Sequence, residues 1–169
     1  MPVPDDLAVF CEIQRPRLVG MLGLHCGDAA VAEELAHDAI AKACERWPKV
    51  GRMEFPEAWI WRVALNLATS YFRRKAAEKR ASARLQAFPE EAIPDPSSTW
   101  AVEVRQAVAS LPPRQRSALV LRYYLDLSII ETAQVMDCSE GTVKALTHKA
   151  EASLRGHPSL AGVRGAVDA

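Results

Sequence analysis

The stretch from residue 56 to residue 75, PEAWIWRVALNLATSYFRRK, constrains the fold more than any other part of the chain. Pro56 suits the first position of a helix, where its missing N–H costs nothing, and Glu57 complements the positive charge of a helix start. No glycine or proline follows within the stretch, so the sequence predicts one long helix. This helix has two apolar stripes and is therefore expected to be largely buried. The stripes hold Ile60, Val63, Ala64, Leu67 and Tyr71, and Trp61, Leu65, Ala68 and Phe72.

The remaining edge of this helix combines an aromatic ring, an amide, hydroxyls and cations. Such a combination suits nucleic acid, because aromatic rings stack on bases, amides read base edges and cations hold phosphates. For the helix taken alone, the stronger interpretation is a solvated edge whose cationic C-terminal end interacts favourably with the helix dipole. The residues are Trp59, Arg62, Asn66, Thr69, Ser70 and Arg73, followed by Arg74 and Lys75.

Charge is distributed unevenly over the 169 residues, a length that fits one ordinary domain or two small ones. The formal net charge is zero, which by itself argues against a nucleic-acid-binding protein. Residues 61–85, however, hold seven basic and one acidic side chains, whereas residues 1–60 hold six basic and ten acidic ones. A concentrated basic patch can bind DNA even on a neutral protein.

The N-terminus and the cysteines indicate a cytoplasmic protein with reduced thiols. No cofactor is expected. Asp5 and Asp6 stand where a signal peptide would have basic residues, and no apolar run approaches membrane-spanning length. A metal site is conceivable from two histidines and two cysteines, but buried thiols and surface histidines explain them more simply, so no metal is expected. These four residues are His25, Cys26, His37 and Cys44.

The rest of the chain reads as helices and one linker. Asp6 is expected to cap a first helix that Pro16 breaks or kinks, residues 25–28 to form a turn, and Pro48 to end the second helix. Proline and serine residues indicate a linker over residues 81–99. The other helices are expected at residues 29–46, 56–75, 114–124, 128–136 and 140–155, with a short one between residues 100 and 111 and no sheet.

Two helices near the C-terminus are closely spaced. Ser128 and Glu131 form a capping box at the first, and Ser139 caps the second after a tight turn at Asp137 and Cys138. This arrangement is a helix-turn-helix, which also occurs in plain helical bundles. The capping box, the short turn and the Gly-Thr-Val-Lys start of the second helix together favour DNA binding. Thr142, Lys144 and His148 lie on its outward side.

Two stretches resemble the extracytoplasmic-function (ECF) group of bacterial sigma factors, in the sigma-70 family. AEELAHDAIAKACERW followed by FPEAWIWRVALNLATSYFRRK resembles region 2 of that family. SLPPRQRSALVLRYYLDLSIIETAQVMDCSEGTVKALTHKAEASLR resembles its region 4. The order of the motifs, the linker and the length agree, and the match covers residues 7–155.

The resemblance implies an all-α protein with two small helical domains joined by a flexible linker, the C-terminal one a helix-turn-helix domain. The expected divisions are residues 1–80 for region 2, 81–99 for the linker, 100–156 for region 4 and 157–169 for a tail. Such a protein is a non-catalytic initiation subunit that binds core RNA polymerase and promoter DNA. A further protein partner, an anti-sigma factor, is expected to clamp both domains and hide the helix at 56–75.

The resemblance also implies roles for particular residues. Those that would bind the β′ clamp of core RNA polymerase are Glu34, His37 and Asp38. Those that would contact the promoter −10 element are Trp59, Arg62, Asn66, Ser70, Arg73 and Arg74, with Asn66 reading a base and residues 49–55 holding a flipped base. Those that would contact the −35 element are Thr142, Lys144 and His148.

The chain departs from the usual family pattern at five positions. His37 replaces a usual Gln, Ser70 an Asp, Leu65 a basic residue, Leu146 an Arg, and Asp137 a Gly of the turn. The −35 surface is consequently only weakly basic.

Two other classes of protein remain as alternatives. A stand-alone helix-turn-helix regulator would explain residues 128–155 but leaves the polar edge of the 56–75 helix without a role. A metal-dependent enzyme would need a cluster of ligands at regular spacing, which the sequence lacks.

Overall fold

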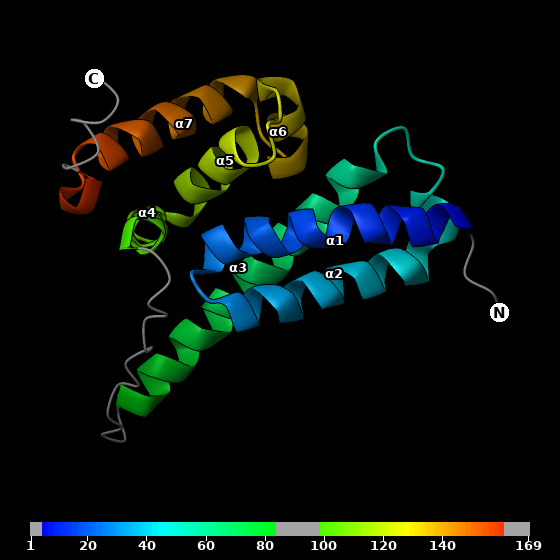
Figure 1. The fold of residues 1–169 in the computed structure, drawn as a ribbon, viewed down its shortest axis with the longest axis horizontal. Coiled ribbons are helices and arrows are strands. Elements are labelled where there is room, and N and C mark those ends of the chain that lie inside the picture. Colours follow the sequence, from blue (N-terminus) through cyan, green and yellow to red (C-terminus); the bar gives the residue numbers. More distant parts are fainter. Residues whose placement is uncertain (1–4, 84–98, 161–169) are drawn as a thin grey trace.

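The computed structural model describes residues 5–83 and 99–160, and these residues form helices and turns with no strand (Figure 1). The predicted all-α class is therefore confirmed. The helices are α1 (Asp5–Cys26), α2 (Ala29–Val50), α3 (Pro56–Ala83), α4 (Thr99–Ala109), α5 (Pro113–Tyr123), α6 (Ile129–Met136) and α7 (Glu140–Arg155), followed by the short 3-10 helix η1 (Pro158–Leu160).

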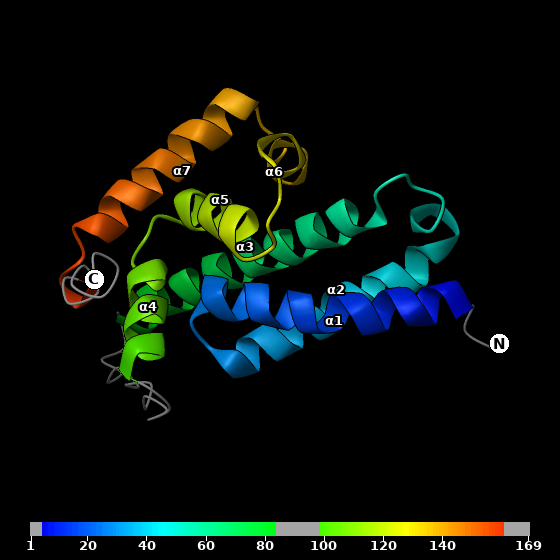
Figure 2. The same cartoon turned by 45° about the horizontal axis from the view of Figure 1, so that its top comes forward.

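The N-terminal half is a three-helix unit in which α1 and α2 lie side by side and α3 packs against both (Figures 1 and 2). The connection between α1 and α2 reverses the chain at Gly27, whose φ of 72° falls in the left-handed region that glycine adopts without strain. Asp28 then caps α2, because its carboxylate accepts a hydrogen bond of 3.1 Å from the Val31 N–H.

Two prolines that were predicted to interrupt helices do not do so. Pro16 lies inside an unbroken α1, where the flanking Gln14 and Leu18 are buried in the core and their packing outweighs the lost backbone hydrogen bond. Pro48 lies near the end of α2, where the Gly51 N–H still donates to the Trp47 carbonyl at 2.8 Å and closes the last turn.

Three predicted boundaries also shift. Asp6 lies within the first turn of α1 instead of preceding it, and its carboxylate accepts hydrogen bonds from the Leu7 N–H and from Trp47 Nε1. The predicted turn at residues 25–28 begins only after Cys26, the end of α1. The long helix continues past residue 75 to Ala83, so residues 81–83 of the predicted linker are helical. The rest of that linker, residues 84–98, lies outside the described residues.

The helix-turn-helix has the predicted local structure. The Ser128 side chain accepts from the Glu131 N–H at 3.1 Å while the Glu131 carboxylate accepts from the Ser128 N–H at 2.7 Å, which is a complete capping box. Asp137 ends α6 in the left-handed conformation with φ of 52°, which Asp tolerates better than most non-glycine residues. Ser139 caps α7 through the Thr142 N–H.

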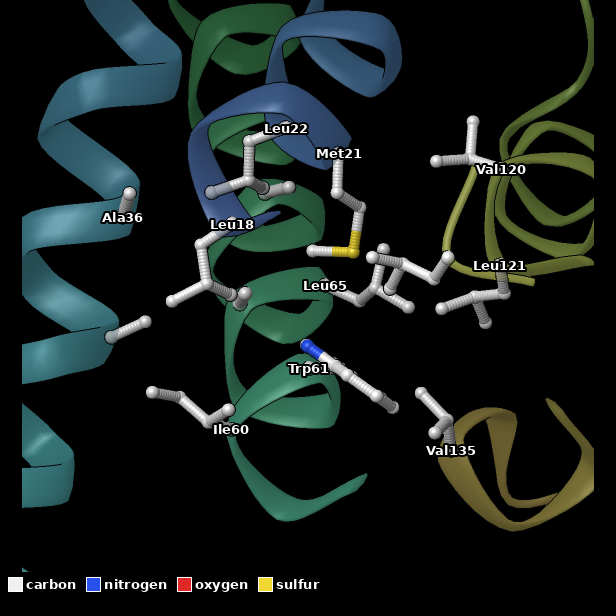
Figure 3. Packing of buried hydrophobic residues seen from close by; sticks show 14 of the residues in the cluster. Leu18, Met21, Leu22, Ala36, Ile60, Trp61, Leu65, Val120, Leu121 and Val135 are labelled. Carbon is white, nitrogen blue, oxygen red and sulfur yellow. The ribbon is translucent and has the colours of Figure 1, made fainter. Parts of the chain in front are cut away.

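One hydrophobic core runs through both halves of the molecule (Figure 3). Ile60 on one stripe of α3 lies toward α2, while Trp61 and Leu65 on the other stripe lie toward the side chains of α5 and α6. Both predicted apolar stripes of α3 are thus used, each against a different set of helices. The residues of the second contact are Met21, Trp61, Leu65, Val120, Leu121 and Val135.

Candidate nucleic-acid interface

The polar edge of α3 is only partly open to solvent. Asn66, Arg73 and Arg74 are exposed, as expected for residues that meet a ligand. Trp59 is half-buried and packs against the hydrophobic core, and Ser70 is half-buried as well. Arg62 and Thr69 are exposed as well, so the edge is open from Arg62 to its cationic C-terminal end except at Ser70.

Arg62, one turn before Asn66, is engaged by the C-terminal half of the molecule. Its Nε donates to the Val135 carbonyl at 3.3 Å, and its terminal NH2 group donates to the Gln134 carbonyl. Both carbonyls belong to the last turn of α6, whose acceptors have no partner within the helix. Arg62 thus caps α6 in this arrangement, and its predicted DNA contact requires that bond to be released.

The predicted −35 residues lie together on α7. The buried side chains of Val143 and Ala150 lie on the inner side of this helix. Lys144 and His148 are exposed on its outer side. Thr142 is half-buried, and its hydroxyl and the Ser139 hydroxyl share a hydrogen bond of 2.9 Å at the N-terminus of the helix. In both views α5 and α6 separate α7 from α3, so the structure keeps the two predicted DNA surfaces apart (Figures 1 and 2).

The predicted polymerase-binding residues share the outer face of α2. Glu34, His37 and Asp38 are all exposed. Nearby, Glu33 accepts from the Arg15 guanidinium of α1 at 3.5 Å in a solvent-exposed ion pair, an arrangement that contributes little to stability. The face is acidic and leaves its carboxylates available to a basic partner.

A polar cluster at the junction of α1, α4 and α5 was not predicted. Arg116 of α5 donates to the His25 carbonyl at 2.6 Å, to the Ala109 carbonyl at 2.6 Å and to the Leu111 carbonyl at 2.9 Å. The His25 ring bonds the Ser117 hydroxyl through Nε2 at 3.0 Å. No local pattern distinguishes Arg116 from the exposed Arg114 two residues earlier, so only the tertiary structure reveals this cluster.

The electrostatics of this cluster follow from its burial. Burial, and then the positive charge of Arg116, lower the pKa of His25 to about 4, so the imidazole is neutral at pH 7. Burial raises the pKa of the neighbouring Cys26 thiol to about 11. The hydrogen bonds of this cluster join α1, α4 and α5.

Neither a metal centre nor a membrane span is found in residues 5–83 and 99–160. No group of three or more His, Cys, Asp or Glu side chains in these ranges is placed to hold a metal ion, and His25 is instead bonded to Ser117. No helix there is long and apolar enough to cross a membrane.

Two protein-family models match the chain, in the order in which the motifs occur. Sigma-70 region 2 matches residues 12–78, and Sigma-70, region 4 matches residues 101–154. The RNA polymerase sigma-E factor of Streptomyces antibioticus is 32% identical over 160 residues, covering 89% of this chain and 84% of that protein. The ECF RNA polymerase sigma factor SigW of Bacillus subtilis (strain 168) is 24% identical, covering 89% of this chain and 88% of that protein.

A solved structure has the same fold. The sigma factor RpoE of Bartonella quintana, crystallised in complex with the anti-sigma factor NepR, superposes with a TM-score of 0.74 at 21% identity. The match covers 90% of this chain and 96% of that one, so it includes the helices of both halves.

Proposed function

Since the chain belongs to the ECF group of the sigma-70 family of RNA polymerase sigma factors, we propose a division of tasks among its exposed surfaces. A sigma factor directs RNA polymerase to promoters for transcription initiation. Within that activity, the open edge of α3 contacts the −10 element, the outer side of α7 contacts the −35 element, and the outer face of α2 binds core polymerase. The protein acts in the cytoplasm and catalyses no reaction of its own.

The observation that supports this division best is the exposure pattern of α3. Both apolar stripes of the helix are covered by protein, yet Asn66, Arg73 and Arg74 remain open on the third side. An exposed amide followed by a cationic helix end combines a group that reads a base edge with groups that hold phosphates. Trp59, Arg62 and Ser70 complete the proposed −10 contact once the bond between Arg62 and α6 is released.

The second DNA surface is smaller. Lys144 and His148 project from α7, and Thr142 lies at its N-terminus, the end that enters a major groove in helix-turn-helix proteins. Lys144 is the one lysine or arginine among the three, so this surface adds register and modest affinity.

The acidic face of α2 fits a basic protein surface. Glu34, His37 and Asp38 are exposed side by side, and we assign them to the β′ clamp of core polymerase. A stand-alone helix-turn-helix regulator would have no use for this face or for the edge of α3, and the match to region 2 disfavours that alternative.

A protein partner that holds this chain inactive is part of the proposal. The RpoE protein of similar fold was crystallised with an anti-sigma factor, and both proposed DNA surfaces of this chain would have to be controlled. We propose that such a partner contacts both helical halves and covers the α3 edge.

The test combines run-off transcription with measurement of core binding. Purified chain plus core polymerase should give specific transcripts from a genomic promoter pool, whereas the chain or the core enzyme alone should not. Glu34→Lys with Asp38→Lys should weaken core binding by about 1–3 kcal/mol through charge reversal at the interface.

A matched control is available on the neighbouring helix. Glu12→Lys reverses an exposed carboxylate of α1 and should leave core affinity unchanged. Wild-type core affinity in a folded Glu34→Lys, Asp38→Lys protein would refute the assignment of the α2 face, and absence of any core-dependent transcript would refute the function.

A further inference from the structure

We propose that Cys11 and Cys44 are a peroxide-responsive thiol pair that forms a disulfide between α1 and α2 when the protein is oxidised. Both cysteines are free in this structure. Neither belongs to the DNA or polymerase surfaces proposed above, so the inference is independent of the proposed function. The two side chains meet because α1 and α2 lie side by side and run in opposite directions (Figure 1).

Contacts on both sides of the pair fix how the two helices are aligned. On one side, Trp47 of α2 donates from Nε1 to the Asp6 carboxylate at 3.1 Å, and its ring centroid lies 5.0 Å from that of Phe10. On the other side, the Arg15 guanidinium of α1 pairs with the Glu33 carboxylate of α2 at 3.5 Å. The segments between these contacts must therefore face each other.

The two cysteines lie in those facing segments. Cys11 follows Phe10 directly, and Cys44 precedes Trp47 by three residues. Their thiols are in contact, since the Cys11 and Cys44 side chains share a hydrogen bond. The pair is thus placed by the helix packing and not by chance proximity of two loops.

Small side chains let the helices approach closely enough for a disulfide. Packed helix axes lie about 8–10 Å apart, and small residues at the contact favour the shorter distances. A disulfide needs Cα atoms roughly 4.4–6.8 Å apart, which facing residues of closely packed helices can reach. Bond formation should therefore need little backbone movement. Four of the six buried residues of α2 are alanines, namely Ala32, Ala36, Ala39 and Ala43.

The two thiols differ in exposure, which gives them different roles. Cys44 is exposed and can meet a dissolved oxidant, whereas Cys11 is half-buried beside it. Burial, and then the charge of Cys44 and the hydrogen bond with it, raise the pKa of the Cys11 thiol to about 11. Cys11 therefore keeps its proton while Cys44 reacts. Cys44 is the first site of oxidation, and Cys11 is the resolving thiol.

The chemistry takes two steps and one molecule of hydrogen peroxide. The Cys44 thiolate attacks one peroxide oxygen, the O–O bond breaks, and the departing hydroxide takes up a proton to become water. The sulfur of Cys11 then attacks the sulfenic acid of Cys44, forming the S–S bond as the S–O bond breaks, and the oxygen leaves as water with the Cys11 proton. Two thiols lose two electrons in total, and the peroxide is reduced to two waters.

The other two cysteines serve as internal controls. Cys26 ends α1, about 22 Å along the helix from Cys11 at 1.5 Å per residue, and burial raises the pKa of its thiol to about 11. Cys138 lies in the turn after α6. In a reducing compartment all four thiols persist, and disulfides that form there are usually transient and redox-sensing.

The experiment treats the reduced full chain with hydrogen peroxide at neutral pH. Free thiols are counted in denaturant, and sulfur partners are identified by mass spectrometry of unreduced tryptic peptides. The four cysteines fall on four separate tryptic peptides, so each possible disulfide has its own mass. The variants are Cys44→Ser and Cys11→Ser, and Cys138→Ser is the matched control.

We expect the wild type to lose two of its four thiols and to form one intramolecular link, between Cys11 and Cys44, which a dithiol reductant reverses. Cys138→Ser should form the same link and Cys44→Ser none, while Cys11→Ser should stop at a sulfenic acid on Cys44 that dimedone traps. The oxidised wild type should unfold roughly 5–15 °C above the reduced one, because the bond restrains the unfolded chain.

Several results would overturn the proposal. Four thiols could remain at a peroxide concentration that oxidises free glutathione in the same buffer, or the link could involve Cys26 or Cys138, or join Cys44 of two copies. A lower unfolding temperature after oxidation would show that the bond distorts the packing of α1 against α2, and would exclude the pair as a site of the native fold. None of these measurements uses polymerase or promoter DNA, so failure here and failure of the proposed function are distinguishable.

Discussion

At the scale of single residues, His25 shows how burial decides the chemistry of a side chain. The residue is 2% exposed, its Nε2 bonds Ser117, and its own carbonyl accepts from Arg116. Protonation would place a second positive charge beside the Arg116 guanidinium in a site closed to water. The imidazole is therefore kept neutral, and the site becomes sensitive to acid.

We predict that the free energy of unfolding falls as the pH is lowered from 6.5 to 4. Burial and Arg116 lower the pKa of His25 from 6.5 to about 4, so the unfolded chain binds more protons across this interval. The difference corresponds to about 3 kcal/mol, fully present above pH 6.5 and lost as the pH approaches 4. Urea denaturation at a series of pH values measures it.

The control for this prediction is His25→Gln, which keeps a hydrogen-bonding group toward Ser117 but does not titrate. Its free energy of unfolding should depend less on pH than that of the wild type over the same interval. Equal slopes for the two proteins would show that His25 is not the group responsible.

At the scale of elements, the three sides of α3 face three different surroundings. Its Ile60 side packs toward α2, its Trp61 side packs toward α5 and α6, and its Asn66 side stays open. The open side then ends in Arg73 and Arg74, which are exposed in a region rich in basic residues. In the proposed function, reading and holding of DNA lie on different turns of one helix, so mutation can separate them.

We predict that Asn66→Ala relaxes the preference for one base of the −10 element by about 1–3 kcal/mol, because an amide that bonds a base edge discriminates by this amount. The salt dependence of promoter binding by the holoenzyme should hardly change. Arg73→Ala with Arg74→Ala should weaken all promoters alike and reduce the slope of log affinity against log salt by about 2 or less. Competition assays over a set of −10 variants at several salt concentrations measure both effects. An equal loss on every −10 variant for Asn66→Ala would make this residue structural.

At the scale of the whole molecule, the two helical halves pack together through one shared hydrophobic cluster. Leu121 of α5 is fully buried in the cluster that also holds Trp61 and Leu65 of α3 and Met21 of α1. Loosening either half removes contacts from the other. The molecule should accordingly unfold as a unit.

We predict a single thermal transition for the wild type and for Leu121→Ala, with the variant destabilised by about 2–5 kcal/mol through the cavity that it creates. Differential scanning calorimetry checks both the number of transitions and the loss. Ile130→Ala, at a side chain that is 57% exposed, should change the stability by less than about 0.5 kcal/mol. Two separate transitions in the wild type, with only one displaced by Leu121→Ala, would contradict a shared core.

The sequence alone determined the features that depend on neighbours within four residues along the chain. Capping at Ser128 and Ser139 and the apolar stripes of α3 are of this kind, because a cap or a helix face involves groups no more than a turn or two apart. The all-α class and the open position of Asn66 followed from the same local rules.

Only the tertiary structure decided the features that depend on contacts between distant residues. Of the break or kink expected at Pro16, the break does not occur, because the surrounding packing outweighs one missing hydrogen bond. Arg62 and Val135 are 73 residues apart, and Arg116 and His25 are 91 apart, so no sequence window contains either contact. An arginine on a helix has the same local pattern whether it meets water, DNA or the end of another helix, and its partner is set by how the helices pack.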